Sequence, residues 1–428
     1  MDLPETQAPQ RGETAVNELE VLPLSAQKRV LLVDDDADLL SIRRLRLQAE
    51  GYAVKTVDSS AVAMEAVGSF RPDLIVLDLI MPGLSGETLL AQIREHECFK
   101  AIKIIVNSGK SFECDQKLSL EWGADAYLAK PSEHDALLNL ISKLLRDEVT
   151  VRFWGTRGSI PRPGNDTLKF GGNTPCVSVE LSDDRLFVFD AGTGIVALGR
   201  HLAAGRKRHK FNLFISHPHW DHIQGLPFFQ PLYVQGNEMV VHGTSHGRLS
   251  LREVISGQMD SLYFPITIKE YAARVYFKEL EEGDYEIEKM PLSTICLNHP
   301  GRTLGYRLGN GSGKSVAYVT DNEIYPGGDR YNRSRLAAFL RGVDVLIHDA
   351  TYFDEEYPAH ANWGHSALSE VLKLAEEAQV KKLYLFHHDP SHDDAAVARK
   401  DMFGKRFFEQ RNSGIQCAAA REGMAVVL

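Results

Sequence analysis

Short apolar runs alternate with helix-like segments along the first third of the chain. The apolar runs predict strands at 30–34, 53–58, 73–78, 102–108 and 126–130. Apolar residues at helical spacing predict helices over 39–51, 60–70, 86–96, 112–122 and 133–147. Five successive βα units indicate an α/β domain with a doubly wound parallel sheet over residues 28–147. Residues 1–27 are polar, contain proline and lack a clear period, which predicts a flexible tail.

The pattern changes after the last of these helices, where the strand-like run "VTVRFWG" follows almost at once. Residues 148–150 are the expected linker, and they contain neither glycine nor proline. A connection this short is no loose tether, so we expect the two domains to touch. Residues 151–428 are rich in strand and turn signals and hold 14 of the 16 histidines. The length of 428 residues also favours two domains.

The composition is that of an ordinary soluble globular protein, with 43% hydrophobic and 25% charged residues. The net charge of −10 provides no general attraction for nucleic acid, so such a substrate would need a local basic patch. The five cysteines are scattered and odd in number, which favours reduced thiols in the cytoplasm. The first residues do not have the pattern of a secretory signal, and no apolar stretch approaches the roughly 20 residues that span a bilayer.

Polar residues follow the predicted strands of the first domain. Asp34 and Asp35 end the first strand, Asp78 the third, Ser108 the fourth and Lys130 the fifth. The carboxyl ends of parallel strands share one edge of a sheet, so these side chains should meet. Three adjacent carboxylates repel one another unless a cation is present, which favours a Mg²⁺ site, and a lysine and a hydroxyl suit a phosphoryl group. The alternative, incidental polar residues at strand ends, explains one such residue better than five.

The stretches "VDDD", "LDLIMPGLSG" and "YLAKP" make the first domain resemble the receiver domain of bacterial response regulators. The resemblance implies a flavodoxin-like (βα)5 fold with Asp78 as the phosphorylated residue. It implies Mg²⁺ bound by Asp34, Asp35, Asp78 and the backbone carbonyl of Ile80, a switch formed by Ser108 and Tyr127, and Lys130 paired with the phosphoryl group. The family more often has Thr-Ala where this chain has "SGK". The implied partner is a histidine kinase or phosphotransfer protein, and homodimerisation stays open.

The stretch "ISHPHWDH" places His217, His219, Asp221 and His222 just after an apolar strand-like run. Histidines two residues apart at a strand end can reach one ion, while the Asp-His pair opens the next helix and points at a neighbouring ion. Nitrogen and carboxylate donors without thiolate suit Zn²⁺, Mn²⁺ or iron. A histidine-rich surface turn and a single structural metal are the alternatives.

This H-x-H-x-D-H motif resembles that of the metallo-β-lactamase fold superfamily over about residues 150–428, which implies an αββα sandwich. Further strand-end motifs supply His299, Asp321 and His387 in the family's order. By the resemblance, His217, His219 and His299 hold one metal ion, Asp221, His222 and His387 hold a second, and Asp321 bridges them. Such metal pairs make hydroxide available near neutral pH, and the resemblance gives Asp221 the further catalytic role of orienting this nucleophile.

The segments "LIHDATY" and "GHSALSEVLKLAEEAQVKKLYLFHHDP" resemble the tRNase Z and class II cyclic-nucleotide phosphodiesterase branches. That resemblance makes His365 a contact of the scissile phosphate or the acid that protonates the leaving oxygen, with an expected pKa of about 6.5. No long arm with a Gly-rich tip is evident, and the chain is acidic, so tRNA maturation is disfavoured.

Several other polar residues could have either a functional or a structural role. Arg157, Ser159 and Asn173 face the substrate or serve turn and core roles. His348 is expected to orient a ligand or to lie in the core, and Asp349 to orient a ligand or His365. His388 is expected to orient a ligand or contact substrate. The remaining histidines considered are expected at the surface or in turns; they are His242, His246, His360 and His392. The segment 227–290 is an expected insertion whose aromatic residues pack in the core or, as a second choice, form a lid.

Together these patterns predict a cytoplasmic response regulator whose output domain is a dinuclear, metal-dependent hydrolase. Zn²⁺ is the favoured metal, and a cyclic nucleotide or another small phosphodiester is the favoured substrate. Phosphorylation of Asp78 would control the enzyme. The alternative on the same fold is a thioester or lactone hydrolase, or a diiron redox sensor.

Overall fold

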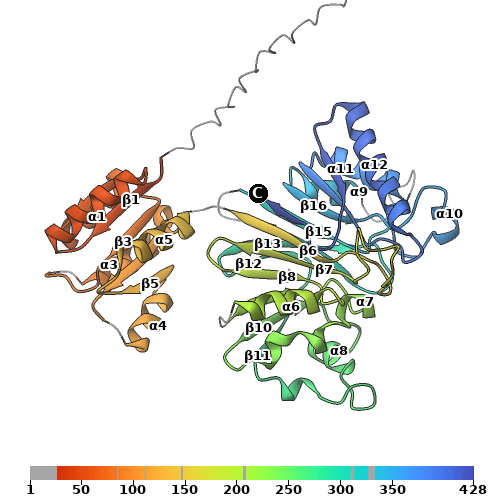
Figure 1. Cartoon of the computed structure of the whole chain (residues 1–428), viewed down its shortest axis with the longest axis horizontal. Coiled ribbons are helices and arrows are strands. Elements are labelled where there is room, and N and C mark those ends of the chain that lie inside the picture. Colours follow the sequence, from red (N-terminus) through yellow and green to blue (C-terminus); the bar gives the residue numbers. More distant parts are fainter. Residues whose placement is uncertain are drawn as a thin grey trace, which may run out of the picture. The chain divides into compact units, whose positions relative to one another are not determined.

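The computed structural model describes residues 27–83, 85–110, 112–145, 148–205, 209–309, 313–325 and 333–428. The tail expected at 1–27 lies outside the described residues except for Gln27. The chain divides into two compact units, Met1–Leu145 and Arg146–Leu428 (Figure 1).

The first unit contains a parallel sheet in the order β2-β1-β3-β4-β5. Its elements alternate along the chain as β1 (Arg29–Val33), α1 (Ala37–Ala49), β2 (Ala53–Val57), α2 (Ser60–Phe70), β3 (Leu74–Leu77), α3 (Gly86–Glu95), η1 (Glu97–Phe99), β4 (Lys103–Ser108), α4 (Glu113–Glu121), β5 (Ala126–Ala129) and α5 (His134–Leu145). The strands β1 and β3 are almost completely buried because helices cover both faces of the sheet. The predicted doubly wound α/β fold is confirmed.

The second unit contains two sheets. The first has the order β11-β10-β9-β8-β7-β6-β19 and the second β12-β13-β14-β15-β16-β17-β18. The first sheet comprises β6 (Val149–Gly155), β7 (Cys176–Leu181), β8 (Leu186–Phe189), β9 (Lys210–Phe214), β10 (Glu238–Gly243), β11 (Arg274–Glu279) and β19 (Ala425–Val427). The second comprises β12 (Gly283–Ile287), β13 (Met290–Leu297), β14 (Thr303–Gly309), β15 (Ser315–Val319), β16 (Val345–Asp349), β17 (Lys382–Phe386) and β18 (Gln416–Ala419). Because β6 begins at Val149, two residues of the expected linker belong to this strand instead.

Helices cover the outer face of each sheet in the second unit (Figure 1). The helical segments are α6 (Ile195–Ala204), α7 (Trp220–Ile223), η2 (Leu226–Phe228), η3 (Gln230–Tyr233), α8 (Leu251–Gly257), η4 (Ile268–Glu270), α9 (Arg333–Leu340), α10 (Tyr357–His360), α11 (Leu368–Glu377) and α12 (Asp394–Arg411). One hydrophobic core lies between the sheets, with Phe153 and Phe214 from one sheet and Tyr306 and Phe386 from the other. Two further cores join the sheets to their helices. The predicted αββα sandwich is confirmed.

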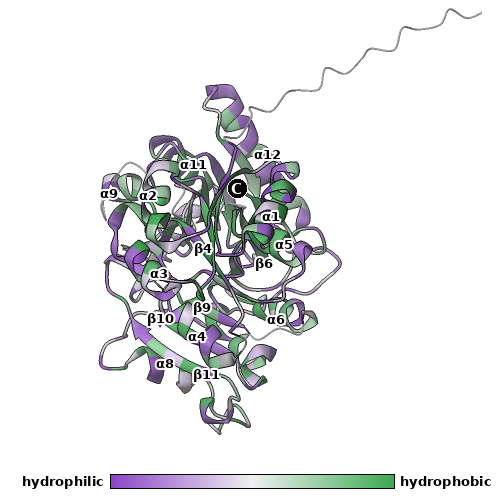
Figure 2. Ribbon diagram, turned by 90° about the vertical axis from the view of Figure 1, so that its left-hand side faces the viewer, coloured by the Kyte–Doolittle hydropathy of each residue, from purple (hydrophilic) through white to green (hydrophobic). Residues whose placement is uncertain are grey.

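The segment 227–290 packs into the first sheet's outer core through buried residues such as Phe229, Leu232 and Ile255. This supports the core-packing interpretation of the insertion, although Leu262 and Tyr263 are exposed. Figure 2 shows that hydrophobic residues follow the central strands, while hydrophilic residues are frequent in outer loops. Within the described ranges, no helix combines the length and apolar composition needed to cross a membrane.

Candidate metal centres

The strand-end residues of the first unit meet as the sequence predicts. Asp34 and Asp78 are buried, and Lys130 Nζ lies 2.8 Å from Asp34 Oδ2 and 2.6 Å from Asp78 Oδ2. Asp35 is exposed, yet its carboxylate lies close enough to both other carboxylates for the three to share an ion. This oxygen-only group suits a hard cation such as Mg²⁺.

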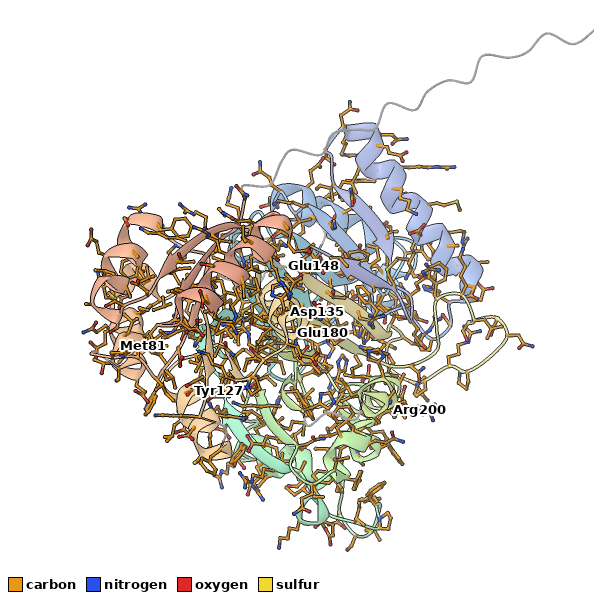
Figure 3. All side chains as sticks on the ribbon, turned by 60° about the vertical axis from the view of Figure 1, so that its left-hand side comes forward. Met81, Tyr127, Asp135, Glu148, Glu180 and Arg200 are labelled. Carbon is orange, nitrogen blue, oxygen red and sulfur yellow. The ribbon has the colours of Figure 1, made fainter. Side chains whose placement is uncertain are left out.

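The remaining residues expected to act with Asp78 lie around it. The backbone N–H of Ile80 donates to Asp78 Oδ1 at 2.9 Å, and Ser108 is fully buried at the end of β4. The hydroxyl of Tyr127, labelled in Figure 3, donates to the backbone carbonyl of Lys110. Lys110 in turn pairs with Glu87 at 2.6 Å, so the departure "SGK" from the family pattern places a cation in this loop.

In the second unit, His217 and His219 follow β9 and converge with His299, from the β13–β14 loop, and Asp321 at the end of β15. The Nε2 atom of His217 lies 2.8 Å from His219 Nδ1, and His299 Nε2 lies 3.2 Å from the same atom. Asp321 Oδ2 completes the group at 3.6 Å from His217 Nε2 and 3.7 Å from His299 Nε2.

A second group forms beside it. Helix α7 carries Asp221 and His222, and His387 follows β17. The Nε2 atoms of His222 and His387 each lie 3.2 Å from Asp221 Oδ2. They also lie 3.3 Å and 3.2 Å, respectively, from Asp321 Oδ1. Asp321 therefore turns one carboxylate oxygen to each group, which is the arrangement that a ligand shared by two ions requires.

Hydrogen bonds fix the other nitrogen of four of these imidazoles. Nδ1 of His217 contacts the Ser216 hydroxyl at 3.1 Å and Nδ1 of His299 contacts the Gly364 carbonyl at 2.9 Å. The corresponding contacts are 3.2 Å from His387 Nδ1 to Thr351 Oγ1 and 2.7 Å from His222 Nδ1 to Asp190 Oδ2. Such contacts hold a ligand imidazole in one orientation.

Sequence reasoning missed Asp190, which is completely buried directly after β8. Its carboxylate accepts from the Ser216 N–H and hydroxyl at 2.7 and 2.8 Å and from the Tyr318 hydroxyl at 2.7 Å. It also meets His222. The available signal was the same as for Asp321, an acidic residue after an apolar run, but the motifs of the family resemblance did not include "LFVFD".

Three residues at strand ends adopt left-handed backbone conformations at this site. The φ angles are 59° at Asp190, 51° at Asp321 and 55° at His387. Positive φ is uncommon for residues other than glycine, although asparagine, aspartate and histidine adopt it more often than most, and such conformations gather at functional sites. The turns aim all three side chains into the same group.

The charges of the site fit divalent cations. The Asp190 carboxylate accepts a hydrogen bond from His222 Nδ1, so a neutral His222 imidazole turns its Nε2 lone pair toward the carboxylates of Asp221 and Asp321. Burial lowers the pKa of His222, but Asp221, Asp321 and Asp190 outweigh burial and raise it well above its ordinary value. Either a proton or a metal ion must therefore sit at this nitrogen. A metal ion suits the site better than a proton, because several buried nitrogen and oxygen atoms converge there and each needs a positively charged partner.

His365 lies against the second group and forms a further potential metal cluster with Asp321 and His387. Its Nδ1 lies 2.8 Å from Asp349 Oδ2, and Thr351 donates to the other oxygen of Asp349 at 2.9 Å. Burial lowers the pKa of His365, but Asp349 and the other carboxylates outweigh burial and raise it to about 9. The expectation of a pKa near 6.5 was therefore wrong because Asp349 is buried beside the ring.

A cavity of about 420 Å³ opens at the site. Its lining residues are Ser159, Pro218, His219, Trp220, Asp221, Asp321, His365 and His387. His219 is the exposed member of the first metal group, so this group borders the cavity.

Several candidates lie elsewhere. Arg157 is fully buried and donates to the backbone carbonyls of Gly171, Asp389 and His392, which is a structural role. Asn173 Nδ2 donates to Glu422 Oε2 at 2.8 Å, so its amide serves the turn.

His348 and His388 are also core residues, because their rings are fully buried and contact the carbonyls of Asp349 and Ala420. His242 is buried in β10 and contacts Asn212, so its expected surface position was wrong. His392 is likewise buried and pairs with Glu356 at 2.9 Å.

Comparisons with known proteins agree with this geometry. Residues 30–142 match the response regulator receiver domain family, and residues 185–388 match the family described as beta-lactamase superfamily domain. The chain joins a response regulator receiver domain to a beta-lactamase-superfamily domain. The receiver domain implies a phosphodonor such as a histidine kinase, and the second domain implies divalent metal binding.

Among curated proteins, the chain is 33% identical over 144 residues to the transcriptional regulatory protein CseB of Streptomyces avermitilis, covering 34% of this chain and 58% of that protein. It is 30% identical over 169 residues to CseB of Streptomyces coelicolor, covering 40% and 69%. The chain thus spans less than two thirds of the length of CseB of Streptomyces avermitilis. Among solved structures, the metallo-beta-lactamase fold protein YhfI of Bacillus subtilis aligns with a TM-score of 0.49 and 17% identity, over 66% of this chain and all of YhfI.

Proposed function

We propose that the beta-lactamase-superfamily domain is a metal-dependent phosphodiesterase that the receiver domain regulates through phosphorylation of Asp78. The observation that carries this proposal is the convergence of the two ligand groups on Asp321, beside a cavity that His365 also lines. His217, His219 and His299 would hold one divalent ion, and Asp221, His222 and His387 the other. When bound, such a pair activates water near neutral pH and neutralises charge that develops on a phosphoryl oxygen.

The charge of the site favours an anionic substrate. Two divalent cations would outweigh the carboxylates of Asp221, Asp321 and Asp190 by one positive charge, while protonated His365 is balanced by Asp349. A phosphodiester anion is attracted to such a cavity more strongly than a neutral lactone or thioester is.

His365 supplies the proton that an alkoxide leaving group requires. The carboxylate of Asp349 orients its ring through Nδ1 at 2.8 Å, which leaves Nε2 to donate toward the cavity. The Asp349 carboxylate opposes the effect of burial on the pKa of His365 and so favours the protonated ring, and a positioned acid of this kind contributes roughly 10²–10⁴-fold to the rate.

Trp220 favours a nucleotide among phosphodiesters. It lines the cavity with 80% of its side chain exposed, so it offers a planar apolar face next to the proposed reaction centre. Exposed indoles of this kind stack on nucleobases.

In the receiver, Lys130 is placed to pair with a phosphoryl group on Asp78, because its amine already lies 2.6 Å from that carboxylate. The proposed Mg²⁺ ligands are Asp34, Asp35, Asp78 and the carbonyl of Ile80, and the proposed switch residues are Ser108 and Tyr127.

The test begins with metal analysis of protein purified without added ions. Turnover of bis(p-nitrophenyl) phosphate and of a cyclic nucleotide panel is then measured with and without phosphorylation by acetyl phosphate. We expect two equivalents of a transition metal, phosphodiester turnover that His365→Gln strongly reduces, and a rate change that Asp78→Asn abolishes. Two equivalents of iron with an oxygen-dependent spectrum and no turnover would instead support the redox role.

A further inference from the structure

Ser159 lies on the wall of the cavity, in the short segment that follows β6. Ser159 is exposed, and it lines the cavity together with Asp221, Asp321 and His365. Among the hydrogen bonds of the described residues, those of Ser159 involve its backbone N–H and not its hydroxyl. The hydroxyl is therefore available to a ligand in the cavity.

The backbone at Ser159 is strained. Its φ angle is 61°, and the N–H of Ile160 donates to the Gly158 carbonyl at 2.7 Å across it. This is a γ-turn with its central residue in the left-handed region, the rare form of that turn. Glycine would adopt this conformation without the clash of a Cβ atom, yet the chain has serine here.

The surrounding structure holds the turn in place against the metal ligands. The N–H of Ser159 donates to Asp221 Oδ2 at 2.8 Å. On the preceding residue, Gly158, a Cβ atom would lie 2.4 Å from the His387 ring, so the backbone packs directly on this ligand. The N–H of Gly158 also donates to the His388 carbonyl at 2.9 Å.

From this geometry we propose that Ser159 is a substrate-binding residue whose hydroxyl donates a hydrogen bond to a non-bridging oxygen of the substrate's phosphoryl group. This proposal rests on the proposed phosphodiesterase function. A serine hydroxyl can rotate to donate to an anionic oxygen, and such a charge-assisted bond is stronger than a neutral one. The need for this hydroxyl explains why a strained position retains serine.

The experiment compares Ser159→Ala, which keeps the Cβ atom and the strain, with Ser159→Gly, which removes both. Ser256→Ala is the control, because its exposed hydroxyl donates to the Arg252 carbonyl on α8. Each full-length, metal-loaded protein is measured for inorganic phosphate binding by calorimetry, for turnover of bis(p-nitrophenyl) phosphate and for Tm.

We expect phosphate binding to weaken about tenfold in both Ser159 variants and to stay unchanged in the control. The Tm should stay unchanged in Ser159→Ala and stay equal or rise by about 1–2 °C in Ser159→Gly. If both Ser159 variants bind phosphate within twofold of the wild type, or if the wild type binds no phosphate, the role of Ser159 is overturned. A Tm that falls by several degrees in Ser159→Gly overturns the strain argument. Weakened phosphate binding in a protein without phosphodiester turnover would support Ser159 and reject the proposed function.

Discussion

The chain has two acidic sites at strand ends, and each compensates its carboxylates in a different way. In the receiver domain, one amine, Lys130 Nζ, lies within 2.8 Å of both Asp34 and Asp78. In the beta-lactamase-superfamily domain, imidazole nitrogens surround Asp321 at 3.2–3.7 Å. In the first site the amine of a long lysine side chain neutralises the carboxylates, whereas in the second the carboxylates face imidazole rings that hydrogen bonds hold in place.

This difference indicates two kinds of ligand. A lysine that is 23% exposed can follow a carboxylate that gains and loses a phosphoryl group, and an oxygen-only site suits a hard cation such as Mg²⁺. Fixed imidazoles lose little freedom when they bind, so they suit metal ions that stay bound. We interpret the first site as one for transient ligands and the second as one for resident ions.

The largest effect is expected from Asp321→Ala, because this change would remove the ligand that we propose both groups share. Turnover of bis(p-nitrophenyl) phosphate should fall by about 10³-fold or more, and metal content should fall below two equivalents. Asp284→Ala, an exposed carboxylate on β12, serves as the control. A variant that keeps both ions after extensive dialysis would show that Asp321 is not a shared ligand.

The second prediction concerns how stability depends on pH, because the pKa values of Lys130 and Lys400 shift in opposite directions. Burial lowers the pKa of Lys130, but the hydrogen bonds that its amine donates to Asp34 and Asp78 outweigh burial, so the net shift is upward. Lys400 on α12 is fully buried and donates to the carbonyls of Ala350 and Thr351 at 2.7 and 2.5 Å. Burial lowers its pKa to about 7 despite nearby carboxylates. A neutral amine still has two hydrogens for these two carbonyls.

Between about pH 7 and 10.5 the unfolded chain therefore binds a proton at Lys400 that the folded chain does not. The free energy of unfolding should rise with pH across this window, by about 5 kcal/mol from this group. Lys400→Met should lose that rise, whereas Lys405→Met, which removes an exposed amine on the same helix, should keep it. Urea denaturation at several pH values measures both, and identical pH slopes in all three proteins would contradict the assignment.

A smaller effect is expected from Asp190→Asn, which keeps the shape of the side chain but removes the charge beside His222. Metal affinity should weaken by about 10–100-fold, as measured by competition with a chelator. Asp344→Asn is a matched control because Asp344 is also buried and accepts from the N–H and hydroxyl of a serine, Ser315. If both variants lose metal equally, general destabilisation rather than positioning explains the loss.

The sequence predicted the folds and the convergence of the ligand groups because strand-end position carries most of that information. In an α/β layout, an acidic residue or histidine after an apolar run lies at the same sheet edge as its counterparts. This principle brought together Asp78 with Lys130 and Asp321 with His387.

The sequence could not reveal every contact between segments that lie apart in the chain. Asp190 follows β8 and meets His222 of α7 and Tyr318 of β15, and no local pattern marks such a meeting. The contact between Asp349 and His365 was among the expected roles of Asp349, but the pKa shift of His365 also depends on burial, which no local pattern shows. His242 looked like a surface residue because a histidine in a strand carries no sign of its burial, which comes from Asn212 and Phe214 on the neighbouring strand β9.

The smallest effect is expected at the cavity wall, where Trp220 carries no charge and compensates no carboxylate. Trp220→Ala should raise the KM for a cyclic nucleotide about fivefold to tenfold with little change in kcat, because stacking stabilises substrate and transition state alike. Trp220→Phe should retain most of the affinity. Trp363→Ala is the control because Trp363 is 60% exposed and is not among the residues that line the cavity. An unchanged KM in Trp220→Ala would mean that the indole does not contact the base and that the selection of substrate rests on the phosphoryl group alone.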